Sequence, residues 1–261
     1  MNPYHASARS AKTKEYKSRF YRKWVNIDDL IMAHLSIQET DLLILTDRPL
    51  NKRWLKGRVL SYRRDLQNYI ARDRRFLTAL KPIAIELNAP DIIKVMANAA
   101  RITNVGPMAA VAGAIAQLLG YDLLNKGYKQ VIIENGGDIF LSKQTKERVV
   151  SIFAGNSKFS GKLNLLIKAD NTPCGICTSS ATFGHSLSFG NADCVVILAR
   201  DAALADATAT AVCNLIKSRD NLKKGIKFAR NISGVFAALI VIDDYLSLWG
   251  DVKIKNYRNE L

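Results

Sequence analysis

A series of short apolar runs, separated by turns or by amphipathic stretches, organises this chain of 261 residues. Runs of this length rich in Val, Ile and Leu are typical of buried strands, and Asn135-Gly136 between two of them is a strong hairpin signal. Some runs follow one another as hairpins and others alternate with helical patterns. This mixture favours an α+β or mixed α/β fold, with mixed β-sheets flanked by helices, over a doubly wound parallel sheet. The predicted strands cover 40–45, 130–134, 138–142, 149–155, 162–169, 193–200, 235–242 and 249–254.

Helical patterns fill the spaces between these runs. The third predicted helix is the most sharply delimited, with Asn104 in the N-cap region, Pro107 at its first position and Gly120 as its stop. No repeat or low-complexity linker interrupts the sequence, so residues 25–261 read as one domain behind a flexible basic arm at 1–24. The predicted helices cover 56–80, a segment from Pro90, 104–120, 204–217 and 222–230.

The chain has a net charge of +15, concentrated in its first third. A basic surface attracts nucleic acid, acidic lipids and phosphorylated metabolites alike, but a simple solvated basic face is the favoured explanation. No helix-turn-helix, zinc-finger or RNP1 signature is present, so nucleic acid is an unlikely partner. Neither a signal peptide nor a strongly apolar span of about 20 residues is apparent, which predicts a cytoplasmic protein with no membrane partner and with free thiols.

The segment 104–120 begins with Gly106 and Pro107, followed by very small side chains. Helix N-terminal amides at such a start can receive a phosphate, and small residues let a flat ligand approach closely. The alternative is tight helix packing in a crowded core.

The turn formed by Asn135, Gly136, Gly137 and Asp138 joins two predicted strands. A plain hairpin explains it well. Its two glycines also leave space through which a ligand can reach the backbone.

Hydroxyl groups crowd the stretch "CTSSATFGHSLSFG", which holds Thr178, Ser179, Ser180 and His185. Such a stretch suits a loop that hydrogen-bonds a polar ligand, and His185 is a candidate acid/base group or phosphate ligand, although a lone His is more often structural. Cys177 just before it gives a weaker Cys-His interpretation. The pair Cys174 and Cys177 also forms a C-x-x-C, for which redox exchange is the minority interpretation.

Asp206 and Thr210 stand four residues apart in "ADATATA", on one face of a predicted helix. A carboxylate and a hydroxyl are hard oxygen donors of the kind that Mg²⁺ takes. The alternative is an Asp favoured by the helix dipole and a Thr bonded back to its own helix.

Taken in order, these segments resemble the ApbE superfamily, the FAD:protein FMN transferases. The match is closer to a shorter branch of unassigned function in archaea and anaerobic bacteria, marked by "VGPMAAVAGAIA", "ENGGDIF" and "CTSSATFGHSLSFG". The resemblance covers nearly the whole chain. It implies the ApbE fold, a flavin nucleotide such as FAD or FMN as ligand, Mg²⁺, a possible protein acceptor and a possible homo-oligomer.

The resemblance also implies a set of site residues. It places the metal at Asp206, Thr210 and the carbonyl of Ala109, and it gives His185 the role of the family histidine. The family's flavin-bordering segments correspond to Gly106, Pro107, Asn135, Gly136, Gly137, Asp138, Thr178, Ser179 and Ser180.

Three departures separate the chain from the transferases. Ala110 stands where they carry a lysine, "SLSFG" replaces their D-P-x-T-G, and Ala181 stands where the short branch usually has Gly. The leading hypothesis is therefore a Mg²⁺-dependent binder of a flavin nucleotide, with cleavage or transfer at its pyrophosphate as the candidate reaction. The alternatives are a sulfur-handling accessory protein of sulfide assimilation toward homocysteine that uses Cys177, and a basic nucleic-acid-binding module.

Overall fold

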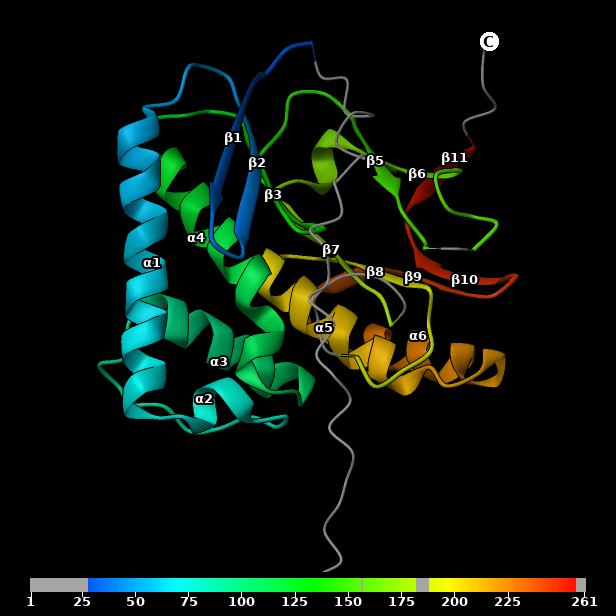
Figure 1. The fold of residues 1–261 in the computed structure, drawn as a ribbon. Helices are drawn as coiled ribbons and strands as arrows, with labels where there is room; N and C mark the ends of the chain where they lie inside the picture. Colours follow the sequence, from blue (N-terminus) through cyan, green and yellow to red (C-terminus); the bar gives the residue numbers. More distant parts are fainter. Residues whose placement is uncertain (1–27, 156, 182–187, 257–261) are drawn as a thin grey trace, which may run out of the picture.

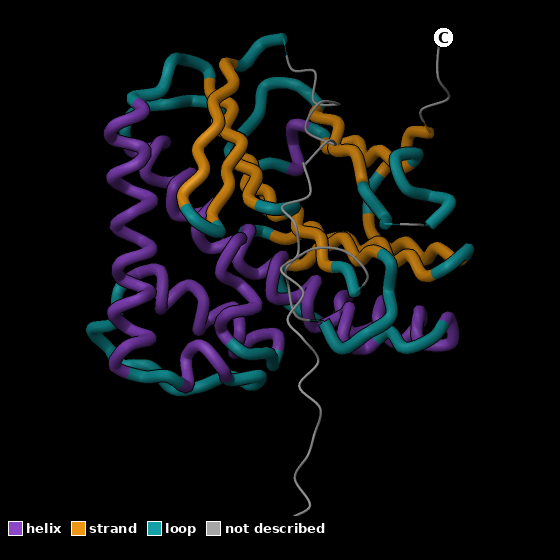
Figure 2. The backbone as a smooth tube through the Cα atoms, viewed as in Figure 1, coloured by secondary structure: helices purple, strands orange, loops and turns teal. Residues whose placement is uncertain are grey.

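The computed structural model describes residues 28–155, 157–181 and 188–256, and these form three layers. Helices cover one face of a large sheet and a small sheet covers the other (Figures 1 and 2). The eight-stranded sheet has the order β1 (Ile31–Ile37), β2 (Thr40–Thr46), β3 (Val131–Asn135), β4 (Asp138–Leu141), β7 (Cys174–Ser179), β8 (Cys194–Ala199), β9 (Val235–Ile242) and β10 (Tyr245–Gly250). The small sheet has the order β11 (Lys253–Asn256), β6 (Leu163–Ile167) and β5 (Arg148–Ile152).

The α+β class is confirmed, and the strand directions refine it. Every pairing between the described strands is antiparallel, so neither sheet mixes parallel and antiparallel pairs as the sequence led us to expect. The chain leaves β4 to build β5 and β6 in the small sheet and then returns to place β7 beside β4. The predicted basic arm at 1–24 lies outside the described residues.

The helical layer contains two long helices that meet the sheet directly, α4 (Val111–Asn125) and α5 (Ala202–Leu215). A 3₁₀ turn at Pro107–Ala110 leads into α4. The remaining helices are α1 (Lys52–Arg72), α2 (Arg75–Thr78), α3 (Asp91–Thr103) and α6 (Leu222–Asn231).

The large sheet is buried on both faces. Ile44 on β2 belongs to the core under the helices, whereas its neighbours Leu43 and Leu45 belong to the core under the small sheet. Side chains along a strand alternate between faces, so burial of both faces requires continuous apolar runs. This explains why β2, β3, β8 and β9 were visible in the sequence as stretches rich in Val, Ile and Leu.

The third helix differs from its prediction at both ends. Asn104 is the left-handed C-cap of α3, with φ of 59°, and not the start of the next helix. Gly120 lies inside α4, where a Cβ would come within 2.2 Å of the Phe140 ring. The glycine therefore admits an aromatic side chain and does not end the helix, which continues to Asn125.

Strands β1 and β7 were missed, and the last predicted strand is two strands. β7 lies at the start of the hydroxyl-rich stretch for which we expected a loop. β1 is an edge strand whose residues are mostly exposed or half-buried, so it lacks the apolar run that marks the central strands. Residues 249–254 contain the end of β10 and the start of β11, which lie in different sheets.

Among the described residues one helical segment, Pro107–Asn125, is long and apolar enough to cross a membrane by length and composition alone. Its mean hydropathy is 1.3, and 56% of that window is buried within the protein. It packs against α5 and β3, as the central helix of a layered core does. Burial of this kind accounts for its apolar composition.

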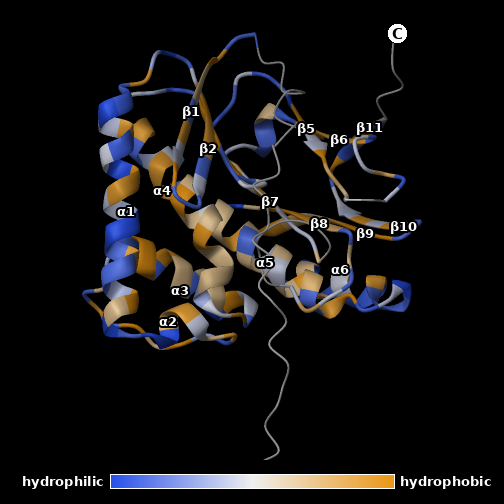
Figure 3. Cartoon of the chain, in the orientation of Figure 1, coloured by the Kyte–Doolittle hydropathy of each residue, from blue (hydrophilic) through white to orange (hydrophobic). Residues whose placement is uncertain are grey.

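The basic charge gathers on the outer side of α1. Leu55, Val59 and Leu66 face the core, while Arg53 and Arg64 are exposed on the opposite side. Figure 3 shows the same division as alternating hydrophilic and hydrophobic stretches along this helix. A solvated amphipathic helix explains this part of the net charge.

Candidate functional site

The first turn of α5 is held between two glycines. A Cβ on Gly113 of α4 would lie 2.4 Å from the Ala202 carbonyl oxygen, and a Cβ on Gly175 of β7 would lie 2.4 Å from Ala202 Cα. Only glycine permits this approach, because real Cβ atoms do not come within 3.0 Å of backbone atoms. The start of α5 is therefore fixed against both α4 and the sheet by backbone contact.

Asp206 lies one turn further along α5 and points back to the start of α4. Its Oδ2 accepts a hydrogen bond of 2.9 Å from the Gly113 amide, and the Ala112 amide also stabilises the carboxylate. Burial nevertheless dominates and raises the pKa of Asp206 to about 7. Free amides at the start of a helix suit an anion, and here a side chain of the protein takes that place.

The β3–β4 hairpin brings two polar side chains to the same region. Asn135 and Asp138 pair directly across the hairpin, and the Asn135 side-chain amide donates to the Ala112 carbonyl at 3.1 Å. Gly136 and Gly137 form the turn with φ of 70° and 104°, a region that favours glycine. Asn-Gly therefore makes the predicted hairpin, and its position below α4 was not visible in the sequence.

Asp138 is a buried carboxyl group that is only partly satisfied. It is 7% exposed, and its Oδ1 has no hydrogen-bond partner within the described part of the chain. Burial, and then the nearby Asp206 carboxylate, hold the pKa of Asp138 well above its ordinary range, and hydrogen bonding to Cys177 and to the Thr178 backbone offsets only part of this. Two buried carboxyl groups therefore lie close enough between the sheet and α5 for one to influence the other.

Cys177 is a core thiol at the edge of this group. It pairs with Asp138 across β4 and β7, it is fully buried, and its Sγ donates to the Ala202 carbonyl at 3.2 Å. Burial, with the two carboxylates, raises the pKa of the thiol well above its ordinary value. Cys174 lies on the opposite face of the same strand, in the other core, so the C-x-x-C pair is not arranged for thiol exchange.

Thr210 lies one turn after Asp206, as the four-residue spacing predicted. Thr208 on the same helix bonds back to the Leu204 carbonyl at 2.7 Å. Within the described residues no such bond involves the Thr210 hydroxyl, although Thr210 is only 8% exposed. Thr210 is therefore the hydroxyl of this helix that stays available to a ligand.

The hydroxyl-rich stretch divides between the two faces of β7. Ser179 lies on the same face of β7 as Cys177, toward the helical layer, where its buried hydroxyl lies beside the Cys213 thiol. Thr178 lies on the other face of the strand, half-buried beside Gly137, and Ser180 follows the strand. His185 lies outside the described residues, so its predicted role stays a prediction.

Packing explains Gly106 and Pro107, which are both buried. A Cβ on Gly106 would lie 1.7 Å from the Ala79 carbonyl oxygen, so the glycine lets the segment before the 3₁₀ turn lie against the chain after α2. Ala109 is half-buried in that turn. The backbone amides that hydrogen-bond the Asp206 carboxylate are those of Ala112 and Gly113, one turn beyond Ala109.

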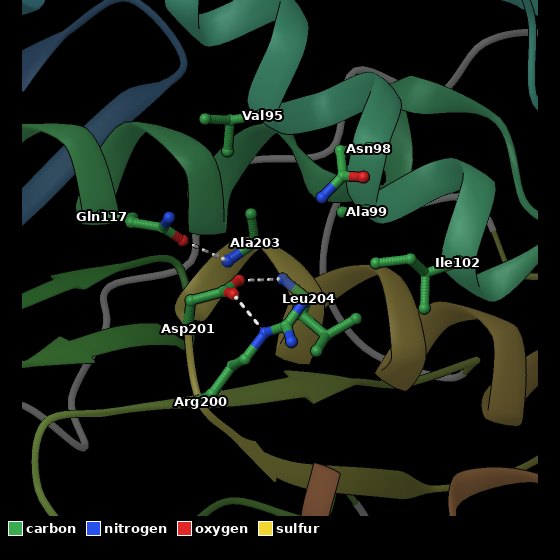
Figure 4. A pocket seen from close by; sticks show the side chains of 9 residues that line it. All are labelled: Val95, Asn98, Ala99, Ile102, Gln117, Arg200, Asp201, Ala203 and Leu204. Atoms are coloured by element: carbon green, nitrogen blue, oxygen red, sulfur yellow. Dashed lines mark hydrogen bonds and ion pairs between the residues drawn. The ribbon is translucent and has the colours of Figure 1, made fainter. Parts of the chain in front are cut away.

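A small hollow lies at the start of α5, between α3, α4 and the loop before α5 (Figure 4). Gln117 accepts from the Ala203 amide at 3.0 Å, and Asp201 accepts from the Leu204 amide at 2.8 Å. Asp201 also pairs with Arg200 at 3.3 Å. The first amides of α5 are thus capped by side chains of the protein, so this hollow offers no free helix terminus to a phosphate.

The donor set near Asp206 fits a hard divalent cation. Among the described residues no group of three or more His, Cys, Asp and Glu is arranged as a metal site. Mg²⁺ needs only one or two carboxylates and completes its shell with neutral oxygens. Near the buried Asp206, Asp138 Oδ1 is a second carboxyl oxygen without a partner among the described residues, and the unbonded Thr210 hydroxyl is a neutral oxygen.

Comparisons with known proteins agree with this architecture. A family model described as AbpE bacteria matches residues 22–231. The chain belongs to this family. The UPF0280 protein of Methanococcus vannielii is 39% identical over 228 residues, covering 86% of this chain and 92% of that relative. The UPF0280 protein of Methanospirillum hungatei is 43% identical over 219 residues, covering 84% and 87% of the two chains.

Solved structures show the same fold at low identity. The flavin transferase ApbE from Vibrio cholerae superposes with a TM-score of 0.56 at 12% identity, over 84% of this chain and 97% of that one. The ApbE protein from Thermotoga maritima gives 0.60 at 12% identity, over 85% and 97%. At such identities the likeness establishes the AbpE-family fold, and function must come from the site itself.

Two residues that shape the site were missed from the sequence. Nothing in the local sequence distinguishes Gly113 or Gly175 from other small residues, because the segment that contacts each glycine is far away in the chain. The signal that was available is their position inside a helix and inside a strand, where glycine is otherwise unfavourable.

Proposed function

We propose that this AbpE-family chain binds a flavin nucleotide, FAD or FMN, together with Mg²⁺, and that FAD is cleaved or transferred at its pyrophosphate. The observation that carries the proposal is the Asp206 carboxylate, held by two amides at the start of α4 beside a second buried carboxyl group and a free hydroxyl. Relatives of known structure with the same fold are named flavin transferases.

In this proposal Asp206, Thr210 and the carbonyl of Ala109 hold the cation, which supplies Lewis-acid polarisation of a pyrophosphate. The amides of Ala112 and Gly113 orient the Asp206 carboxylate, so it needs no rearrangement on binding.

The hairpin glycines 136 and 137 leave the backbone open to the nucleotide. Thr178, Ser179 and Ser180 donate hydrogen bonds to its polar groups. His185 moves a proton or steadies a phosphate. A protein acceptor, a cytoplasmic location and a homo-oligomer belong to the same proposal.

The state of Cys177 favours this proposal over the sulfur-handling alternative. A thiol carrier needs an accessible thiolate of low pKa. Cys177 is fully buried, and its pKa is raised by burial and by two carboxylates. The nucleic-acid alternative loses support because the charge on α1 is that of a solvated amphipathic helix.

The test is a titration of the full chain with FAD, with and without Mg²⁺, followed by flavin fluorescence and by chromatography of FMN and AMP. Asp206→Asn is expected to weaken Mg²⁺-dependent binding at least about tenfold, the scale on which metal-site residues act. The matched pair Thr210→Val and Thr208→Val separates ligation from helix packing, because only Thr208 bonds back to its own helix. Mg²⁺-dependent binding that survives Asp206→Asn would refute the assignment.

A further inference from the structure

The orientation of the β3–β4 hairpin points Asp138 at α5. Asp138 pairs directly with Cys177 on β7, and directly paired residues share one face of an antiparallel sheet. Cys177 reaches the Ala202 carbonyl at 3.2 Å, at the first turn of α5 and one turn before Asp206. Glu134 on the same hairpin has the opposite orientation and bonds the Gly137 amide at 2.7 Å.

One carboxyl oxygen of Asp138 receives no hydrogen bond from the described residues. Its Oδ1 is buried without a hydrogen-bond partner within the described part of the chain. Buried polar atoms are almost always satisfied, and an orphaned carboxylate oxygen is among the costliest exceptions. The acidic neighbour with the largest influence on it is Asp206, which disfavours the charged form of Asp138 and does not satisfy its oxygen.

We propose that Asp138 is a ligand of the same cation as Asp206, so that the centre contains two carboxylates, one from the hairpin and one from α5. This inference rests on the proposed function and extends it. It assigns Asp138 to the metal centre, whereas the resemblance assigned it to the border of the flavin site. A divalent cation between the two groups satisfies the free Oδ1 and removes the repulsion between them. Joining the hairpin to α5 would also tie the two layers of the site together.

The experiment uses Mn²⁺, which has the coordination preferences of Mg²⁺ and is paramagnetic. Free Mn²⁺ is measured by electron paramagnetic resonance during titration of the full chain, with and without FMN. Asp138→Asn keeps the shape of the side chain and removes its charge, and it is expected to weaken Mn²⁺ binding at least about tenfold. Asp47→Asn is the control, because Asp47 follows β2 at the end of the β2–β3 pair remote from Asn135 and binds the amides of Lys129 and Gln130.

A spectroscopic readout distinguishes ligation from a purely structural role. In protein labelled with ¹³C at the aspartate carboxyl carbon, electron–nuclear double resonance at bound Mn²⁺ should show two strongly coupled carboxyl carbons. Asp138→Asn should retain one of them at saturating Mn²⁺. Thermal melting without metal checks folding, and the variant is expected to melt no lower than the wild type because an uncharged amide replaces a buried carboxyl group whose charged form is disfavoured there.

The outcomes separate this inference from the proposed function. Mn²⁺ binding that falls in Asp206→Asn and stays unchanged in Asp138→Asn overturns the role of Asp138 and leaves the proposed function standing. Wild-type protein that binds no Mn²⁺, with or without FMN, refutes both. Weaker FMN binding in metal-free Asp138→Asn, with Mn²⁺ affinity intact, assigns Asp138 to the nucleotide and also overturns the inference.

Discussion

Two buried clusters of ionisable side chains differ in whether the protein itself supplies their hydrogen-bond partners. Arg148, 6% exposed on β5, is paired with Asp29 by two hydrogen bonds of 2.7 and 3.1 Å, and it also bonds Gln144 and Gln130. Asp138 and Asp206 are two neighbouring acidic groups, and Asp138 Oδ1 has no partner among the described residues. The first cluster is complete within the chain, whereas the second needs something that the chain does not supply.

This difference gives a criterion that separates charged groups buried for stability from charged groups buried in a binding site. A charge that serves stability is neutralised by its own protein, because an unpaired buried charge is strongly destabilising. A site retains unsatisfied groups when a ligand completes them. Substitutions in the two clusters should therefore differ in their effects on unfolding free energy, Mn²⁺ affinity and pH dependence.

Removing the charge of Arg148 should have the largest effect on stability. Arg148→Met leaves Asp29 and Gln144 without their partner, and breaking a buried pair in this way costs about 3–5 kcal/mol. Urea unfolding measures the loss, and Mn²⁺ affinity should stay within about twofold. Arg75→Met is the matched control, because Arg75 makes the same two-point contact to Asp73 on the surface, where solvent screens the pair and its removal should change stability little. Equal losses in the two variants would contradict the distinction.

Replacing Gly175 by a larger residue should cause the next largest loss of stability, and it should also lower Mn²⁺ affinity. The added Cβ of Gly175→Ala meets Ala202 Cα at 2.4 Å, and overpacking of this kind costs about 1–3 kcal/mol. Because Asp206 follows Ala202 on α5, we expect Mn²⁺ affinity to fall together with the melting temperature. Gly57→Ala adds the same methyl group where nothing lies within 4 Å, and inside a helix it should stabilise by about 0.5–1 kcal/mol. A stable Gly175→Ala protein with unchanged Mn²⁺ affinity would contradict this account.

The two clusters should respond to pH with opposite signs. The pKa of Asp206 is raised from 3.8 to about 7, so metal-free native protein binds the extra proton and loses stability as pH rises across that interval. The pKa of Asp29 is lowered by its hydrogen bond to Arg148, so its contribution is present above its unfolded pKa and is lost as pH falls through its folded value. One pKa unit corresponds to about 1.4 kcal/mol, so even part of the Asp206 shift gives a measurable slope.

Metal-free melting temperatures between pH 4 and 8 test these signs. Asp206→Asn should flatten the decline toward neutral pH, whereas Asp29→Asn should leave that decline in place. An unchanged profile in Asp206→Asn would show that another group is responsible.

The smallest effect is expected at the edge of the completed cluster. Lys146 lies 3.7 Å from Asp29 with 67% of its side chain exposed. Exposed pairs of this kind contribute less than about 1 kcal/mol, so Lys146→Ala should change the unfolding free energy by no more than about 0.5 kcal/mol at 0.15 M salt. A loss comparable to that of Arg148→Met would mean that Lys146 belongs to the neutralisation of Asp29.

Much of the fold was predictable because burial on both faces leaves continuous apolar runs. Strands β3 and β8 and the spacing of Asp206 and Thr210 needed only local pattern, whereas β7 lacks an apolar run and was not predicted. Edge strand β1 escaped because its exposed positions break that pattern. Gly120, Gly113 and Gly175 could not be interpreted because Phe140 and Ala202, which require them to be glycine, are distant in sequence. The pairing of Asp138 with Cys177 depends on a strand register that no local pattern specifies.

The glycines that hold Ala202 also bear on the entropy of ligand binding. A side chain that must be ordered by its ligand loses rotamer freedom on binding, at about 0.5–1.5 kcal/mol for each flexible group. Asp206 stands on a helix whose first turn cannot slide, and its carboxylate is already fixed by the Gly113 amide. The anchoring half of the site therefore loses little freedom when a ligand arrives, and nearly all of its interaction energy remains available as affinity.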